Sequence, residues 1–160
     1  MAVPENQLPP RAGRAPPSEW TLPAESASIP WARQLAARWL AAAGASEPVT
    51  QDVQLVLSEL VTNAVRASRP DGDIRVELAA GPPGWEVAVS DCGSGFVLPD
   101  GGAAADPLAV GGRGLHVVAE VAGPVSVQHD RGWTVVRTVV ASAPAGDRVI
   151  TPTGSGRSGR

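Results

Sequence analysis

Three short segments of this sequence carry residue types that could bind a phosphorylated ligand. The first contains Glu59 and Asn63, a carboxylate and a carboxamide four positions apart. On a helix this spacing places both side chains on one face, about one turn apart. Asn63 could offer a neutral oxygen to Mg²⁺, and Glu59 could orient or deprotonate an attacking hydroxyl group. Taken alone, the pair also fits an ordinary exposed helix face.

The second segment is the run Asp91-Cys92-Gly93-Ser94-Gly95, which follows a predicted strand. Gly93 and Gly95 would let the backbone approach a flat ligand closely. Asp91 could then accept a hydrogen bond from an exocyclic amine such as that of adenine, a contact that the carbonyl group of guanine could not make. By itself the run also fits a simple turn, because aspartate and glycine are common in turns.

The third segment, Gly111-Gly112-Arg113-Gly114, opens a short helix that we expect from about Leu115 to Ala122. Backbone N–H groups at the start of a helix can converge on an anion, and Arg113 adds a positive charge. The segment is not a Walker loop, because no Lys-Ser or Lys-Thr pair follows the glycines. A purely structural role for these glycines is equally compatible with the pattern.

The helix that carries Glu59 and Asn63 is predicted from apolar residues at helical spacing. It should begin after Ser46, a capping residue, with Pro48 in its first turn, and end near Ala67. Its apolar positions are Val49, Val53, Val56, Leu57, Leu60, Val61 and Ala64.

An earlier helix is predicted over residues 29–43, ended by Gly44. The hydroxyl groups of Ser26 and Ser28 could cap it just before Pro30.

Strands are predicted at residues 20–22, 74–78, 85–89, 125–128 and 133–140, with a loop over residues 91–112. Two helices, a hairpin, a third helix and two further strands indicate an α+β fold. We expect a two-layer α/β sandwich whose mixed, mostly antiparallel sheet is covered by helices on one face.

The overall composition favours a single domain that binds a protein or a small ligand. The 160 residues include 13 basic and 16 acidic side chains, and the net charge of −3 argues against binding to nucleic acid or to an anionic membrane. We expect a proline-rich leader over residues 1–18, the working domain over residues 19–142 and a flexible tail over residues 143–160. A single cysteine and the absence of a signal peptide or a long apolar stretch favour the cytoplasm.

The joint pattern of the three segments resembles the GHKL ATP-binding superfamily. SELVTNAV is similar to its N-box, DCGSG to its first glycine box and GRGLHVV to its second. The opening WTLPAESASIPWARQLAARWL and the ending Gly132-Trp133-Thr134 resemble the actinobacterial anti-sigma-factor serine kinases of the RsbW and SpoIIAB type. The resemblance covers residues 19–140, nearly the whole expected domain.

This resemblance implies a Bergerat-type ATP-binding fold with ATP and Mg²⁺ as ligands. It implies a protein that holds a sigma factor and phosphorylates a serine of an anti-anti-sigma partner of the STAS type, with a homodimer possible. It also implies the role of each site residue: Glu59 as catalytic base, Asn63 as Mg²⁺ ligand, Asp91 and Thr134 for adenine, Gly93 and Gly95 beside the base and sugar, and Gly112, Arg113 and Gly114 at the phosphates.

Two other functions stay open from the sequence. The same pocket could hold a nucleotide only to shape a protein-binding surface, with little or no phosphoryl transfer. A detached histidine-kinase catalytic domain is the third interpretation, which the missing helical dimerisation segment and acceptor histidine disfavour.

Several further residues are expected to be structural. Trp31 and Trp39, two turns apart on the first helix, are predicted to share one face and to pack in the core. His116 and His129 form no metal-binding cluster and are assigned structural roles. Cys92 is expected to fill space in the glycine-rich run.

Overall fold

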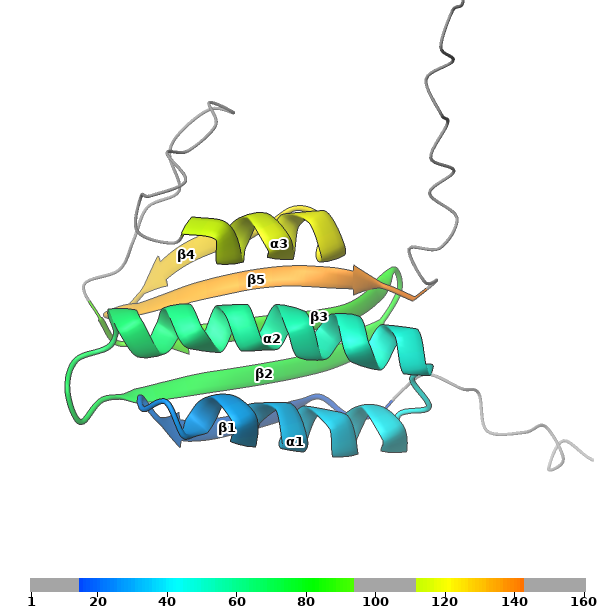
Figure 1. The fold of residues 1–160 in the computed structure, drawn as a ribbon, viewed down its shortest axis with the longest axis horizontal. Helices are drawn as coiled ribbons and strands as arrows, with labels where there is room; N and C mark the ends of the chain where they lie inside the picture. Colours follow the sequence, from blue (N-terminus) through cyan, green and yellow to red (C-terminus); the bar gives the residue numbers. More distant parts are fainter. Residues whose placement is uncertain (1–14, 94–111, 143–160) are drawn as a thin grey trace, which may run out of the picture.

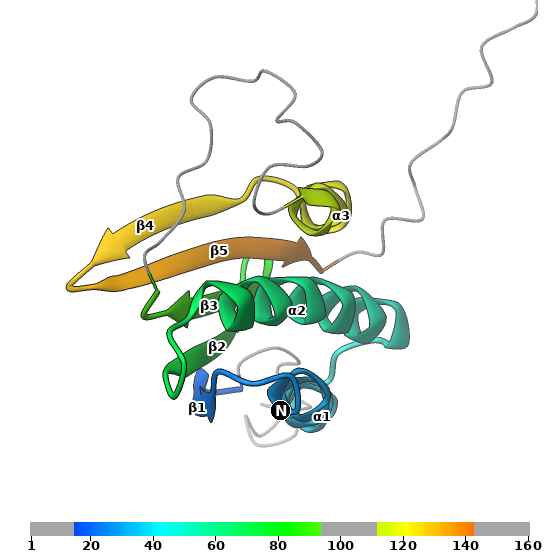
Figure 2. The ribbon, with the colours of Figure 1, turned by 60° about the vertical axis from the view of Figure 1, so that its left-hand side comes forward.

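The computed structural model of the chain describes residues 15–93 and 112–142. They form a five-stranded sheet with three helices on one of its faces (Figure 1 and Figure 2). In chain order the elements are β1 (Ser18–Pro23), α1 (Ser28–Ala42), α2 (Glu47–Ala67), β2 (Asp73–Gly81), β3 (Gly84–Asp91), α3 (Gly112–Ala122), β4 (Ser126–Asp130) and β5 (Trp133–Ala141). The predicted α+β sandwich is confirmed.

Within the described ranges, no helix has both the length and the apolar character needed to cross a membrane.

The strands are ordered β1-β2-β3-β5-β4, and every neighbouring pair is antiparallel. The sequence predicted a mixed sheet, so the described strands correct this detail. The reason lies in the connections. The pair α1 and α2 returns the chain to the end of the sheet at which β1 finishes, so β2 runs antiparallel to β1. The connection that includes α3 brings the chain back to the end of the sheet at which β3 begins. Strands β3 and β4 therefore run in the same direction, but β5 lies between them.

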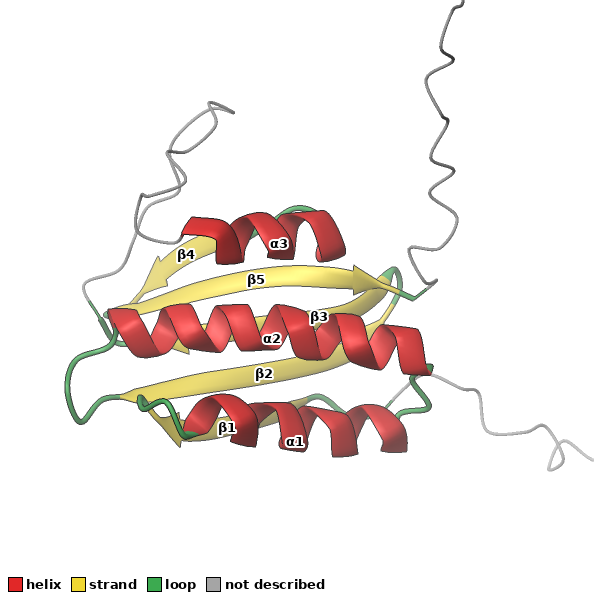
Figure 3. Ribbon diagram, in the orientation of Figure 1, coloured by secondary structure: helices red, strands yellow, loops and turns green. Residues whose placement is uncertain are grey.

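Helix α2 lies over the middle of the sheet, roughly along the strands, and supplies much of the core (Figure 3). The seven apolar residues predicted for its buried face are all buried, none more than 4% exposed. Helices α1 and α3 pack against its two sides. Each valine or leucine buried in this way contributes about 2 kcal/mol of transfer free energy, so this face holds α2 firmly in place.

Serine hydroxyl groups do not cap either of the first two helices, contrary to the prediction. Helix α1 begins at Ser28, and Ala27 occupies its N-cap position. Because Ser28 already lies in the first turn, its Oγ donates to the carbonyl oxygen of Pro23 at 2.7 Å. Ser46 does occupy the N-cap of α2, but its side chain makes no capping hydrogen bond.

The prediction that Trp31 and Trp39 share a buried face is wrong for Trp31, which is 53% exposed. Trp39 packs edge-on against Trp85, with ring centroids 5.9 Å apart, and its Nε1 donates to the carbonyl oxygen of Pro16 at 3.1 Å. The reason is geometric, since a separation of eight residues turns a helix through two full turns and about a further 80°.

Candidate functional site

Helix α2 holds Glu59 and Asn63 half-buried on adjacent turns. The amide nitrogen Nδ2 of Asn63 is buried and has no hydrogen-bond partner among the described residues. Leaving a buried polar group unpaired costs about 1–3 kcal/mol, so native proteins seldom do so without a reason. A ligand that completes the hydrogen bonding of this side chain would supply that reason.

The start of α3 lies directly against this pair. A Cβ atom placed on Gly114 would be 2.5 Å from Oε2 of Glu59 and 3.7 Å from Nδ2 of Asn63. Any side chain at position 114 would therefore displace the Glu59 carboxylate. Two of the three segments singled out in the sequence thus meet in space, although they are far apart along the chain.

Helix α3 begins at Gly112, three residues before the predicted start at Leu115. Gly112, Arg113 and Gly114 therefore form its first turn, where backbone N–H groups lack partners within the helix. These groups are available to an anion beside Glu59 and Asn63. The orientation of the Arg113 side chain lies outside what the structure describes.

Asp91 ends β3 and is only 2% exposed. Its Oδ1 accepts a hydrogen bond from the backbone N–H of Gly93 at 2.9 Å. Burial raises the pKa of Asp91 above its ordinary value of 3.8, while the Gly93 hydrogen bond and the charge of His129 act to lower it. A carboxylate buried in this way is able to accept a hydrogen bond from a ligand that covers it.

Gly93 brings the chain after β3 against the end of α2. A Cβ atom on Gly93 would collide with the carbonyl oxygen of Ala67. The glycine is thus required by a close approach between two backbone segments, whether or not a ligand also contacts it. Gly95, the other glycine predicted in this run, lies outside the described residues.

Replacing Gly93 with alanine is expected to destabilise the fold by about 2 kcal/mol, because the carbonyl oxygen of Ala67 belongs to the backbone and cannot rotate away. The measurement is the free energy of unfolding in urea. Gly81→Ala is the matched control, since a Cβ atom there would meet nothing within 4 Å. An equal effect of both substitutions would show that the contact with Ala67 is unimportant.

Thr134 lies beside Asp91, because the two residues are paired in the register of β3 and β5. Its hydroxyl group is buried and lies 3.2 Å from Nδ1 of His129, which is paired with Thr134 across β4 and β5. Sequence reasoning assigned His129 a structural role and missed its place next to the predicted adenine-binding residues. The turn at Arg131 and Gly132 was the available signal, because a two-residue hairpin turn pairs positions 129 and 134.

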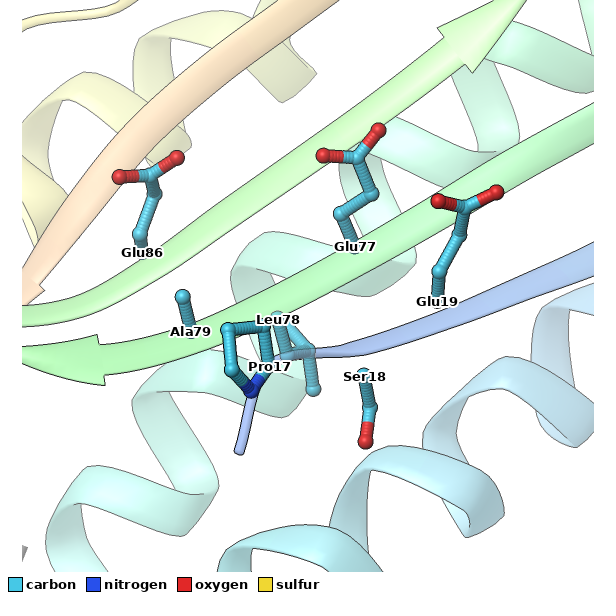
Figure 4. A pocket seen from close by; sticks show the side chains of 7 residues that line it. All are labelled: Pro17, Ser18, Glu19, Glu77, Leu78, Ala79 and Glu86. Carbon is cyan, nitrogen blue, oxygen red and sulfur yellow. The ribbon is translucent and has the colours of Figure 1, made fainter. Parts of the chain in front are cut away.

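A hollow on the opposite face of the sheet is a different feature. It is lined by Pro17, Ser18, Glu19, Glu77, Leu78, Ala79 and Glu86. The carboxylates of Glu19, Glu77 and Glu86 project over it from three neighbouring strands (Figure 4). Arg137 on β5 pairs with Glu77 at 3.9 Å and with Glu86 at 3.1 Å, so two of these carboxylates are already engaged within the sheet. The hollow lies on the other side of the sheet from Glu59 and Asn63 and is separate from the candidate site.

Comparison with known proteins agrees with this arrangement. Residues 22–140 match the family described as the histidine kinase-like ATPase domain. The serine-protein kinase RsbW of Listeria monocytogenes serovar 1/2a is 32% identical over 108 residues, which cover 60% of this chain and 69% of that protein. RsbW of Listeria innocua serovar 6a shows the same identity and coverage.

A solved structure, that of the RsbU and RsbW domains of Rv1364c from Mycobacterium tuberculosis, has a similar fold. Its TM-score is 0.59 at 24% identity, with 79% of this chain and 32% of that longer chain covered. This chain therefore corresponds to about a third of that protein. The family match and the sequence relatives show that this chain belongs to the histidine kinase-like ATPase family and, within it, to the serine-protein kinases of the RsbW type.

Proposed function

We propose that this chain is an ATP-dependent protein serine kinase that also acts as an anti-sigma factor. The observation that carries the proposal is the meeting of Glu59 and Asn63 with the glycine-rich start of α3. A carboxylate and a carboxamide lie there beside the first turn of a helix, whose backbone N–H groups have no partners within the helix. This combination suits the transfer of a phosphoryl group. The relatives named serine-protein kinase RsbW support the same activity.

The order of residues along α2 supports a nucleotide lying beside this helix. Gly93 lies against Ala67, at the C-terminal end of α2, and donates a hydrogen bond to Asp91. The adenine base would therefore bind near this end of the helix. Asn63 and Glu59 follow about 6 and 12 Å further along the helix axis, towards the phosphate end. The adenine amine would donate to Asp91, with Thr134 beside it. Gly93 and Gly95 would flank the base and sugar.

The donor set near Asn63 fits Mg²⁺. The carboxamide of Asn63 offers a neutral oxygen, the kind of ligand that Mg²⁺ prefers. Its Nδ2 has no hydrogen-bond partner among the described residues, so the amide nitrogen could donate to a phosphate oxygen. Magnesium is commonly held by one or two protein oxygens together with the substrate phosphates. Bound there, it would neutralise charge on the phosphates, which Gly112, Arg113 and Gly114 would contact from the start of α3.

In this proposal Glu59 acts as the base. A serine hydroxyl group of the protein substrate would attack the γ-phosphorus, forming an O–P bond while the bond to the bridging β–γ oxygen breaks. The hydroxyl proton would pass to the carboxylate of Glu59, and ADP would leave. The first turn of α3 would stabilise the negative charge on the equatorial oxygens through its N–H groups.

The proposed protein partners follow from the family. The chain would bind a sigma factor and phosphorylate an anti-anti-sigma protein of the STAS type, alone or as a homodimer. Because a sigma factor acts with RNA polymerase, the proposal places this activity in the cytoplasm. Under the alternative function, the pocket holds ATP or ADP only to shape the partner-binding surface.

Titration calorimetry with Mg·ATP and Mg·GTP tests the nucleotide site. We expect the parent chain to bind ATP in preference to GTP, and Asn63→Ala to weaken binding of Mg·ATP at least tenfold because the metal loses a protein ligand. Gln51→Ala removes a carboxamide from the exposed side of α2 and is the matched control. Lack of ATP binding to the parent chain would overturn the proposal.

A further inference from the structure

A row of polar side chains crosses three strands of the sheet on the face that the helices cover. Asp91 on β3 is paired with Thr134 on β5, which is paired in turn with His129 on β4. Asp91 and Thr134 are each 2% exposed, whereas His129 lies exposed on β4, at the edge of the sheet. The row thus extends from the part of the proposed pocket where adenine would bind to the solvent-exposed edge of the sheet.

The contact between His129 and Thr134 decides what the threonine hydroxyl group can offer a ligand. Nδ1 of His129 lies 3.2 Å from Oγ1 of Thr134. If Nδ1 carries no hydrogen, it accepts the hydroxyl hydrogen, and Thr134 can only accept a bond from the pocket. If Nδ1 carries a hydrogen, as it always does in the protonated ring, it donates to Oγ1 and leaves the Thr134 hydrogen free for the pocket.

Adenine requires the arrangement in which the Thr134 hydroxyl group donates its hydrogen to the ligand. When its exocyclic amine donates to Asp91, the adjacent ring nitrogen N1 is an acceptor and needs a donor beside Asp91. Thr134 is the neighbouring side chain, so it must donate. Guanine presents the opposite pattern, an acceptor oxygen followed by an N–H donor. A Thr134 hydroxyl group fixed as a donor therefore favours adenine over guanine.

We propose that His129 is a positioning residue of the nucleotide pocket, which fixes Thr134 as a hydrogen-bond donor and strengthens the preference for adenine when the imidazole is protonated. This inference rests on the proposed nucleotide site. Histidine is the side chain whose charge ordinarily changes between about pH 5 and 8, so the preference depends on pH in that interval.

Asp91 on β3 lies within electrostatic reach of His129. Asp130, the next residue on β4, pairs with Arg131 in the turn, where Nε and Oδ1 are 4.0 Å apart. On α3, His116 and Glu120 are exposed and pair with each other at 3.2 Å.

The test measures the dissociation constants of Mg·ATP and Mg·GTP at pH 6, 7 and 8 for the full chain and three variants. Titration of the γ-phosphate affects both nucleotides equally, so the ratio of the two constants isolates recognition of the base. In the parent chain we expect the preference for ATP to fall about tenfold from pH 6 to pH 8, the size of one hydrogen bond.

His129→Asn and His129→Phe are expected to lose this pH dependence. Asparagine keeps a hydrogen-bonding group that does not titrate, so it should retain more preference for ATP than phenylalanine. Asp91 is unchanged in both variants, so any pH dependence of its own remains visible in them. His116→Asn, the control at the other described histidine, should follow the parent chain.

Two outcomes would overturn the inference while leaving the nucleotide site in place. One is a parent chain that binds ATP with a preference independent of pH, and the other is a pair of His129 variants that keep the parent's pH dependence. Absence of ATP binding to the parent at every pH would overturn the proposed function as well. Thermal unfolding of each variant verifies that it is folded, which the exposed position of His129 favours.

Discussion

Glu59→Gln is expected to slow phosphoryl transfer from ATP to the serine of a protein substrate by about 10²–10⁴-fold, the usual contribution of a general base. Glutamine has nearly the same shape, so it should keep the packing of Glu59 against Gly114 and change the affinity for Mg·ATP by less than about threefold. The measurements are transfer of labelled γ-phosphate to a STAS-type protein that the parent chain phosphorylates, and calorimetric titration with Mg·ATP.

Glu47→Gln is the control for this prediction. Glu47 lies on the same helix, in its first turn, where its Oε1 accepts a hydrogen bond from Gln51 at 3.0 Å, away from α3. This variant should transfer phosphate at the parental rate. If Glu59→Gln also did so, Glu59 would not be the base. If the parent bound ATP but phosphorylated no STAS-type protein, the chain would be a nucleotide-holding interaction module.

The secondary structure could be predicted because burial imposes regular spacing on it. The apolar residues of α2 recur at helical spacing, and Ile74, Val76 and Leu78 alternate on β2, so both elements were found within a few residues of their ends. Local hydrogen bonds were harder to predict. Ser28 was expected to cap the first helix, but its Oγ donates to the carbonyl oxygen of Pro23 instead.

The candidate site was only partly visible in the sequence. The helical spacing of Glu59 and Asn63 predicted that the two would share a face, but their contact with Gly114 depends on how α3 packs on α2. His129 was missed because its contact with Thr134 depends on the register between β4 and β5. The hairpin turn at Arg131 and Gly132 fixes that register, and the composition of the strands does not reveal it. Long-range packing and register are therefore what the sequence pattern leaves open.

Asp91→Asn is expected to have opposite effects on binding and on stability. The carboxamide keeps an oxygen that can accept the Gly93 N–H, but it places an NH₂ group where the adenine amine would donate. Binding of Mg·ATP should weaken about 100-fold, the upper range for a hydrogen bond to a charged group. Guanine offers a carbonyl oxygen at that position, so the preference for ATP over GTP should fall as well.

The free protein should become more stable with asparagine at position 91. Because burial raises the pKa of Asp91 above 3.8, the folded state holds the proton more tightly than the unfolded state. The contribution of Asp91 to stability is therefore complete below pH 3.8 and is lost as the pH rises through the raised pKa. At pH 7 we therefore expect the variant to be more stable than the parent chain and to have a higher Tm.

Thermal unfolding from pH 4 to pH 8 measures this difference, which should shrink as the pH falls through the raised pKa of Asp91. Asp130→Asn is the control, since Asp130 is an exposed carboxylate at the same edge of the sheet. It should alter neither nucleotide preference nor the pH dependence of Tm. A destabilised Asp91→Asn protein that still preferred ATP would mean that Asp91 supports the fold and does not recognise the base. Greater stability combined with lost preference for ATP would mean that the buried carboxylate is retained for binding at the expense of the fold.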